Sequence, residues 1–446
     1  MKRRVLRSLC LILSVMFLLS AVVGCGASKP ADTASEPAKA ADGAKSGDAE
    51  KSKEPAAPAT IKFASWAQRG DTPDVDWIAG FEKKYPNYKI DYMAVTEGNY
   101  SEKLNAMIAA KAAPDVILAW ECDIGRFAKN KAIIPLDEYI KKTEAFKEDD
   151  LVPALTGFNE MLGASYGLPW CMAVEIMYYN KDMFDKAGVK YPTNDWTWQE
   201  FEDAAKKLTI VKDGKTVQWG VDSISFQGLW YSTFGSAGDK IVDDKGVLQL
   251  GDGAKKALQW QADLTNKLKV SAPPAPSGTN AVDLFSSGKA AMTRMGNWMI
   301  QTYRPIKDFK WDIAPLPKDT KQYTTLHTGL FTINAESKVK DAAWAFIEYS
   351  MGDEGQERIC KMGTNPSARK SITAKGFYRA GGENGPTNWE AIDKSVGFAE
   401  FGYVVANPGV ASTFGVNAFN AVMMGQMDVD TAIKKINEEA QKVAAE

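Results

Sequence analysis

From residue 60 onward, apolar residues alternate with polar ones or recur at helical spacing, and this pattern predicts an ordered series of elements. The first five are strand 61–66, helix 72–85, strand 88–95, helix 100–111 and strand 115–120. In the first helix, Thr72-Pro73 is typical of a helix start, and Ile78 and Phe81 share one face. The strand at 115–120 is almost continuously apolar, as expected for a parallel strand covered on both faces. Strands that alternate with helices predict an α/β fold.

Helical periodicity returns in the second half of the chain. Thr197, followed three residues later by Glu200, has the form of a capping box, and apolar residues then recur at helical spacing. Further amphipathic helices are predicted at 255–268 and 341–349, and the chain ends in another at 429–443. The sequence has no repeat of fixed period.

The N-terminus has the pattern of a bacterial secretion signal. Four Lys and Arg residues precede an apolar run at 9–23, which suits a signal peptide and is short for a membrane span of ~20 residues. Small residues then lead into Cys25, and this resembles a lipobox, in which the cysteine is lipidated and residues 1–24 are removed. A plain secretory signal and an uncleaved anchor are the alternatives. Residues 26–59 contain no aromatic residue, which predicts a disordered tether at 25–59 that begins with the lipidated cysteine.

Charge and cysteine content limit the classes of function. The formal net charge is −2, and loss of the four positive charges in residues 1–24 makes it about −6. A net negative charge does not indicate binding to nucleic acid or to an anionic membrane surface. Cys122, Cys171 and Cys360 are widely spaced and lack any CxxC pair, so we expect neither a zinc site nor a disulfide framework, and we predict no cofactor. One incidental disulfide and buried free thiols both remain open.

Eight short segments, taken together and in order, resemble one protein family. They are residues 81–86 (FEKKYP), 113–117 (APDVI), 134–137 (IPLD), 166–170 (YGLPW), 177–182 (MYYNKD), 196–201 (WTWQEF), 285–292 (FSSGKAAM) and 314–317 (APLP). Each segment is short, but the series covers nearly all of the chain after residue 60 and follows a lipobox. It is similar to the extracellular solute-binding proteins of family 1, the carbohydrate receptors of ABC importers.

The resemblance implies two α/β lobes of the type II periplasmic-binding-protein-like fold, with a ligand cleft between them and a hinge that the chain crosses more than once. Laid onto this sequence, the N-terminal lobe takes residues 60–172 and 316–366, and the C-terminal lobe takes 173–315 and 367–446. The ligand would lie outside the carboxyl ends of the strands, as in other open α/β sheets. Closure would be a hinge motion that the ligand stabilises.

Residues that bind a sugar are expected among the aromatic and polar residues that directly follow strands. A sugar needs flat aromatic surface for its apolar faces and fixed donors and acceptors for its hydroxyls. On this basis, and from the resemblance, we predict the ligand-binding residues Trp66, Trp120, Glu121, Asp123, Trp170, Glu175, Trp230, Asn297, Trp298, His327 and Arg369. Trp230 is expected in an aromatic loop. Trp298 is the best single candidate, although it and Trp66 could instead fill a core. Asp123 could instead cap a helix, and His327 and Arg369 could be structural.

Three functions remain open on the sequence alone. The first is a monomeric receptor, lipid-anchored at the outer face of the membrane, that delivers a sugar or oligosaccharide to the transmembrane subunits of an ABC permease. The second is a receptor of the same fold for a non-sugar solute such as a polyamine, or one that serves a sensor kinase. The third is a surface glycoside hydrolase, which needs a pair of carboxylates across the bond it cleaves. The chain has 56 acidic residues, so some such pair can always be found, and its presence has little weight. H-E-x-x-H, P-loop and dinucleotide motifs are absent, so we expect a binding protein and not an enzyme.

Overall fold

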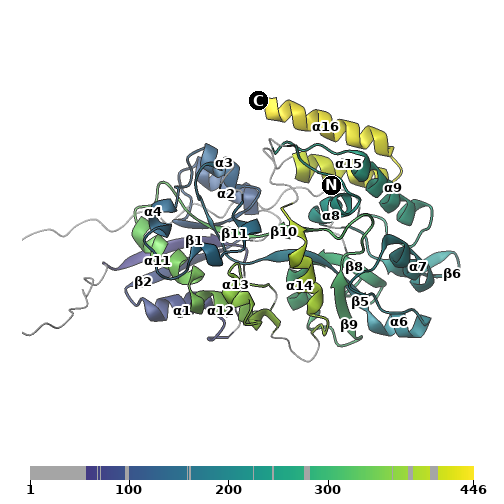
Figure 1. Cartoon of the computed structure of the whole chain (residues 1–446), viewed down its shortest axis with the longest axis horizontal. Coiled ribbons are helices and arrows are strands. Elements are labelled where there is room, and N and C mark those ends of the chain that lie inside the picture. Colours follow the sequence, from purple (N-terminus) through teal and green to yellow (C-terminus); the bar gives the residue numbers. More distant parts are fainter. Residues whose placement is uncertain are drawn as a thin grey trace, which may run out of the picture. The chain divides into compact units, whose positions relative to one another are not determined.

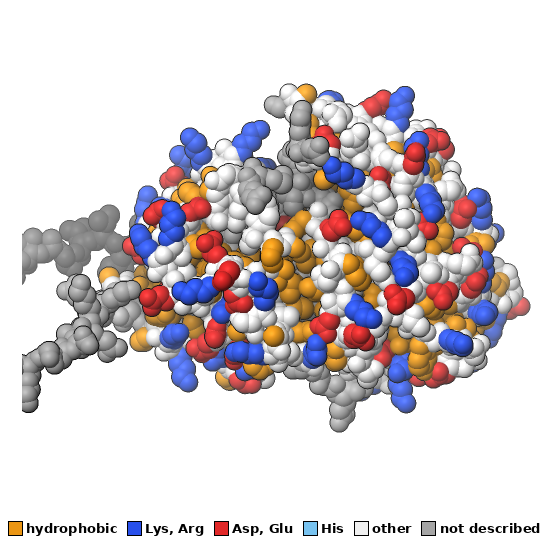
Figure 2. All heavy atoms as spheres, viewed as in Figure 1, with side chains coloured by type: hydrophobic (Ala, Val, Ile, Leu, Met, Phe, Trp, Pro, Cys, Tyr) orange, Lys and Arg blue, Asp and Glu red, His pale blue; other side chains and the backbone are white. Residues whose placement is uncertain are grey.

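The computed structural model describes residues 57–445, except 68, 71, 96–99, 158, 160–161, 225, 244–245, 276–281, 364, 380–384 and 402–409. The expected signal segment at 1–24, Cys25 and nearly all of the expected tether lie outside the described residues. The strands form one five-stranded and one seven-stranded sheet (Figure 1). On the face drawn in Figure 2, side chains of both charge signs are interspersed, and hydrophobic side chains gather near the middle.

The five-stranded sheet has the strand order β2-β1-β3-β11-β4. Its strands are β1 (Ala59–Ser65), β2 (Tyr88–Ala94), β3 (Val116–Trp120), β4 (Leu168–Pro169) and β11 (Gly329–Ile333). Strand β1 runs parallel to β2 and β3, whereas β11 runs antiparallel to β3 and β4. The carboxyl ends of β1 and β3 therefore share one edge with the start of β11.

Helices cover both faces of this sheet. They are α1 (Trp77–Lys84), α2 (Tyr100–Ala109), α3 (Ile124–Lys129), α4 (Asp137–Ile140), α11 (Lys340–Met351) and α12 (Asp353–Lys361), with 3-10 turns η2 (Glu148–Asp150) and η3 (Pro153–Leu155). Phe63 of β1 packs against Trp77 of α1 and Phe346 of α11. Its neighbour Ala64 points to the other face, where Tyr100 of α2 donates to its carbonyl. Two separate cores follow from the alternation of side chains along the strand.

Helix α1 begins later than the sequence predicts. The pattern at Thr72 predicts its start there, but the helix begins at Trp77 with Asp76 as its N-cap. The Asp76 carboxylate accepts hydrogen bonds from the amides of Ile78 at 3.1 Å and Ala79 at 3.0 Å. An aspartate that satisfies two otherwise unpaired amides is the better cap, and the start predicted from the Thr-Pro pair is therefore wrong.

The seven-stranded sheet has the order β12-β10-β5-β8-β7-β6, with β9 also paired to β5. Its strands are β5 (Ala173–Asn180), β6 (Ile210–Lys212), β7 (Lys215–Val221), β8 (Ala290–Gly296), β9 (Trp311–Pro315), β10 (Thr324–His327) and β12 (Ala399–Glu400). Strand β5 is buried along its whole length and is antiparallel to β8, β9 and β10. It is the central strand of this half of the chain.

The helices and turns of this half are α6 (Lys181–Ala187), α7 (Trp198–Leu208), α8 (Gly228–Ser236), α9 (Asp252–Asn266), α10 (Ile300–Tyr303), α13 (Lys370–Thr373), α14 (Glu390–Gly397), α15 (Gly415–Met423) and α16 (Val429–Ala445), with η4 (Asn297–Met299), η5 (Phe377–Arg379) and the π-helix η6 (Val410–Phe414). The predicted capping box is confirmed at the start of α7, where Thr197 and Glu200 bond each other's backbone amides. Helices α8, α9, α15 and α16 share one core (Figure 1).

The chain passes between the two sheets from β4 to β5, from β10 to β11 and again after α12, and these passages lie side by side. Thr328 donates its hydroxyl to the carbonyl of Cys171 at 2.7 Å, and the amide of Met172 donates to Pro366 at 2.9 Å. We expected the return to the first lobe at residue 316. Strand β10 pairs with β5, however, so the return occurs at Thr328. The segment before residue 316 is β9 of the seven-stranded sheet, and the chain stays with this sheet through β10.

Candidate functional site

Two tryptophans lie together where strands of the first sheet end. Trp66 follows β1 and Trp120 ends β3, and their rings stack with centroids 3.6 Å apart and planes 16° apart. Both rings are partly exposed, and the edge of Tyr100 meets Trp66 at 4.8 Å. Gly329 leaves room for this arrangement, because a Cβ atom there would lie 2.9 Å from Trp66 and 3.0 Å from Trp170. The result is flat aromatic surface at the sheet edge where the sequence predicts it.

The acidic residues after β3 are buried beside this stack. Asp123 occupies the N-cap position of α3, but its side chain makes no capping hydrogen bond. It instead accepts hydrogen bonds from Ser101 and Arg126, and burial raises its pKa above the ordinary value. The helix-capping alternative for Asp123 therefore does not describe its side chain. Glu121 is also buried, and its Oε2 has no hydrogen-bond partner.

The only histidine of the chain joins two of the predicted acids. His327 Nδ1 lies 3.0 Å from Glu121 Oε1, and His327 Nε2 lies 3.0 Å from Glu175 Oε1. Burial alone lowers the pKa of His327, but the hydrogen bonds to Glu121 and Glu175 outweigh it and raise the pKa from 6.5 to about 9. Both ring nitrogens are thus held by carboxylates, and the imidazole is 4% exposed. The expectation that His327 itself contacts ligand does not fit this geometry.

Glu175 is fully buried among polar groups of the second sheet and α8. Its second carboxylate oxygen accepts a hydrogen bond from Ser232, which also lies 2.9 Å from the hydroxyl of Thr325. Arg294 of β8 lies on the same side and donates to Gln261 at 3.0 Å. Burial lowers the pKa of Arg294 to about 10, and the negative charge of Glu175 opposes this shift. Because its carboxylate is enclosed, Glu175 is placed to hold His327 and not to meet a solute directly.

Trp298 extends the aromatic surface on the second sheet. Its ring is partly exposed and makes T-shaped contacts with Phe226 and His327, at centroid distances of 5.2 and 5.8 Å. Asn297, immediately before it, is fully buried, and its side-chain oxygen accepts from the amide of Val174 at 3.1 Å. The Trp298 ring is therefore partly accessible beside His327, and Asn297 ties η4 to β5.

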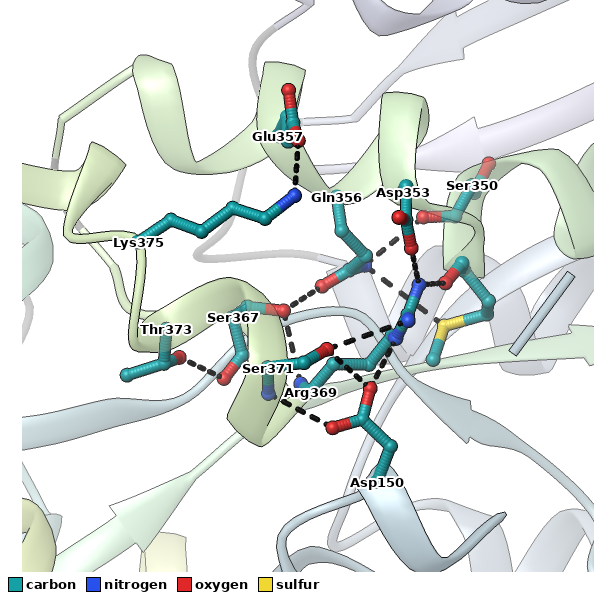
Figure 3. A network of polar contacts seen from close by, with 11 residues as sticks. Asp150, Ser350, Asp353, Gln356, Glu357, Ser367, Arg369, Ser371, Thr373 and Lys375 are labelled. Atoms are coloured by element: carbon teal, nitrogen blue, oxygen red, sulfur yellow. Dashed lines mark hydrogen bonds and ion pairs between the residues drawn. The ribbon is translucent and has the colours of Figure 1, made fainter. Parts of the chain in front are cut away.

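Three further predicted residues are buried. Trp170 is 7% exposed and packs in the core of the first sheet. Trp230 is 1% exposed and packs against Phe419, because residues 228–231 belong to α8 and not to the expected aromatic loop. Arg369 is buried in a network in which its guanidinium bonds Asp150, Asp353 and the carbonyl of Met351 (Figure 3). Each of the three is therefore enclosed by protein.

The sequence does not single out Phe226, Ser232 or Arg294. Phe226 lies five residues after the end of β7, too far for a rule that favours residues directly after strands. Ser232 and Arg294 give no such signal, since each lies inside a regular element and acts only through Glu175 or its neighbours. Their role depends on the packing of α8 and β8 against β5.

The described residues do not form a catalytic triad around His327 or a cluster of metal ligands. Residues 163–167 have the spacing G-x-S-x-G, but Ser165 accepts a hydrogen bond from Asn159, and both ring nitrogens of His327 are held by glutamates. Among the described residues, no group of three or more His, Cys, Asp or Glu side chains could hold a metal ion. Cys122, Cys171 and Cys360 are free thiols. None of the helices within those residues is long and apolar enough to cross a membrane.

Two α/β lobes with adjacent crossings, and aromatic and acidic residues at the strand ends, define a solute receptor. Residues 60–357 match the bacterial extracellular solute-binding protein family, and the chain belongs to this family. The family resemblance and the two-lobed fold expected from the sequence are confirmed.

Curated relatives include the sn-glycerol-3-phosphate-binding periplasmic protein UgpB of Escherichia coli K12. It is 26% identical over 258 residues, which cover 55% of this chain and 58% of that protein. The chain therefore spans 58% of the length of this relative. Among solved structures, an ABC substrate-binding protein from Listeria monocytogenes in complex with cycloalternan is 26% identical with a TM-score of 0.78, over 87% of this chain and 99% of that one. A solute-binding protein from Thermotoga lettingae bound with α-D-tagatose is 22% identical with a TM-score of 0.72, over 87% and 100%.

Proposed function

We propose that this protein is the substrate-binding lipoprotein of an ABC importer, which captures a sugar or oligosaccharide between its lobes and delivers it to the permease. The stacked pair Trp66 and Trp120 carries this proposal. Partly exposed indole rings suit the C–H faces of a pyranose, and their position at strand ends is where open α/β folds bind ligands. Trp298 offers a further ring on the second sheet.

The acids near these rings favour a neutral polyhydroxyl solute. Glu121 retains a carboxylate oxygen without a partner, and a solute hydroxyl could donate to it. The Listeria and Thermotoga proteins of similar fold are described in complex with cycloalternan and with tagatose, respectively. These observations support the sugar assignment over the polyamine alternative, although an ammonium group would also suit a carboxylate.

A second candidate solute is sn-glycerol 3-phosphate, which the name of the Escherichia coli relative indicates for that protein. A phosphate group requires unpaired Arg or Lys side chains or helix N-termini. Beside the tryptophan stack, Arg126 is paired with Asp123, and Glu121 adds negative charge. This distribution disfavours a phosphate and makes the sugar the better proposal.

The cellular setting belongs to the same proposal. Cleavage before Cys25 and lipidation of this residue would anchor the protein at the outer face of the membrane, with 25–59 as a tether. In that position a monomer can meet the transmembrane subunits of its permease. We further propose that the protein is not an enzyme, since His327 is committed to Glu121 and Glu175.

Calorimetric melting with a panel of solutes tests the solute assignment. Saccharides at one hundred times their Kd should stabilise the native protein by about 2.7 kcal/mol and be recovered unchanged. Trp66→Ala should abolish this effect, whereas Trp389→Ala, which removes a partly buried tryptophan beside α14, should leave it intact. Stabilisation by sn-glycerol 3-phosphate or spermidine alone would refute the sugar assignment, and turnover of a glycan would refute the binding-protein assignment.

Replacing Cys25 tests the anchor. Cys25→Ser should release the protein from the membrane fraction into the medium or periplasm, because a lipid can no longer be attached. Cys122→Ser is the matched control and should leave the protein in the membrane fraction. Retention of the Cys25→Ser variant would mean that residues 9–23 remain as an anchor.

A further inference from the structure

His327 lies where the chain changes from one sheet to the other. It is the last residue of β10, and Thr328 alone separates it from Gly329, the first residue of β11. Strand β10 belongs to the seven-stranded sheet through β5, and β11 belongs to the five-stranded sheet through β3. A rotation of one lobe against the other must therefore act on the backbone next to this imidazole.

The two carboxylates that hold the imidazole come from opposite sides of this crossing. Glu175 lies on β5, the neighbour of β10, so its contact with His327 is internal to the second lobe. Glu121 follows β3, the neighbour of β11, so its contact with His327 joins the two lobes. Rotation about Thr328 would change the distance from Glu121 to His327 and leave the distance to Glu175 unchanged.

We propose that His327 is a positioning residue that fastens one arrangement of the two lobes by binding Glu121 and frees them when this contact breaks. The contact is a single hydrogen-bonded ion pair, which is either made or broken, so it can separate two discrete arrangements. The inference goes beyond the proposed sugar binding, because it concerns the lobes in the absence of any solute.

The charges around the imidazole favour the contact between His327 and Glu121. Glu121 and Glu175 contribute two buried negative charges, and Arg294 contributes one positive charge on the Glu175 side. Only a protonated His327 balances the second carboxylate. A buried charge without a counter-charge is strongly unfavourable, so the cluster holds the proton, and the proton holds Glu121.

The other groups next to the imidazole do not compete for this role. Asp123 and Arg126, beyond Glu121, form a salt bridge with each other. Phe226 and Trp298 present uncharged rings to His327 at centroid distances of 5.4 and 5.8 Å. Helix α8 approaches at Gly228, where any Cβ atom would collide with Glu175 and His327. This close approach keeps the imidazole and Glu175 in place as one unit of the second lobe.

Glu121 is the part of the cluster that can leave. Its Oε1 meets His327, whereas its Oε2 is buried without a hydrogen-bond partner. An unsatisfied buried oxygen costs free energy, and exposure of Glu121 to water or to a solute would remove that cost. The cost of breaking the ion pair is therefore partly offset, which keeps the two arrangements close in free energy.

The single histidine makes the contact directly measurable. In protein labelled with ¹⁵N-histidine, every ring signal belongs to His327. Both nitrogens should show imidazolium shifts at pH 7, with a titration midpoint well above 6.5. In both Glu121→Gln and Glu175→Gln the midpoint should fall toward 6.5, because each variant removes one carboxylate from the same ring. A native midpoint near or below 6.5 would overturn the proposal.

A measurement of the distance between the lobes distinguishes the proposed role of His327 from a purely structural one. Spin labels at Lys129→Cys on α3 and Lys207→Cys on α7, two exposed positions, report this distance without any solute. The full chain carries them with Cys10, Cys25 and Cys122 replaced by Ser. At pH 5.5, below the expected midpoint of His327 in either variant, Glu121→Gln should shift or broaden the distance distribution, whereas the matched Glu175→Gln, in which protonated His327 still binds Glu121, should leave it unchanged.

Equal distributions in the two variants, with only a lower melting temperature, would overturn the proposal. Should Glu121→Gln fail to fold, the native chain can be brought from pH 7 to pH 10, which removes the proton from His327. The distribution should then change in the native protein and not in His327→Gln, and no change in either would also overturn the proposal. The absence of saccharide binding would contradict the proposed function and leave these solute-free results unaffected.

Discussion

Replacing Arg369 with Ala should destabilise the fold and leave solute affinity unchanged, because the guanidinium connects three segments near the third crossing. Its Nε donates to Asp150 at 2.8 Å, and one terminal nitrogen donates to Asp353 at 2.6 Å and to the carbonyl of Met351 at 3.2 Å. Figure 3 shows the side chain enclosed by these groups. Asp150 comes just before Leu151, which forms an isolated β-bridge with Arg369 itself. Met351 is the last residue of α11, and Asp353 is the first residue of α12.

The magnitude follows from what each partner loses. Removing one member of a buried ion pair costs about 3–5 kcal/mol. The Arg369 side chain is 9% exposed and that of Asp150 17%, but Asp353 is 64% exposed and regains water when the arginine is removed. Asp150 also keeps hydrogen bonds from the amide and hydroxyl of Ser371, at 2.8 and 2.6 Å. We therefore expect a loss of about 2–4 kcal/mol.

Urea unfolding followed by circular dichroism measures this loss as a lower midpoint at an unchanged slope. Arg369→Lys is the informative control, since an ammonium keeps the charge but cannot span Asp150 and Asp353 as a fork does. It should recover only part of the stability. A loss below about 1 kcal/mol for Arg369→Ala would refute the reasoning. So would an Arg369→Lys variant that is fully stable but no longer binds saccharide, because the guanidinium would then contact the ligand.

Three further outcomes follow from the geometry. Gly329→Ala places a Cβ atom 2.9 Å from Trp66 and 3.0 Å from Trp170. The overpacking should lower the free energy of unfolding by about 1–3 kcal/mol and shift the tryptophan emission, and an unchanged emission spectrum would contradict this reasoning. The raised pKa of His327, about 9 when folded against 6.5 when unfolded, stabilises the fold below pH 6.5, and this gain is lost as pH rises to 9. The free energy of unfolding from urea curves, relative to His327→Gln, should therefore be roughly 3 kcal/mol larger at pH 6 than at pH 9.5. Thr197→Ala should cost about 1 kcal/mol through the lost cap of α7, measured by the same unfolding.

Elements with a clear pattern of apolar residues could be predicted from the sequence, and a fully buried helix with small polar residues among its apolar ones could not. Helix α2 starts at Tyr100 as predicted, and α16 covers the predicted 429–443, because their apolar residues recur at helical spacing. Helix α8 is buried at every position from Gly228 to Ser236 and shows no such contrast. Its Ser and Thr residues resemble a loop until the neighbouring β10 and α9 are known.

The candidate site divides along the same line. Trp66 and Trp120 could be predicted to meet, since parallel strands bring their carboxyl ends to one edge. The contacts of His327 could not be predicted, because its partners Glu121 and Glu175 lie 206 and 152 residues away and no local pattern selects them. Such pairings depend on the register of β10 on β5 and of β11 on β3.

Arg369 and His327 are buried near two of the crossings, and they differ in how easily their contacts can break. Arg369 makes several hydrogen bonds to segments around the third crossing, so motion there would have to break them together and leave more than one buried group unpaired. Across the second crossing, His327 contacts Glu121, and Glu121 gains an alternative partner when released. Rotation of the lobes should therefore use the crossing at Thr328 and preserve the network of Arg369. The lobes would then move as rigid bodies about an anchored third crossing, with the contact between His327 and Glu121 made or broken at the second.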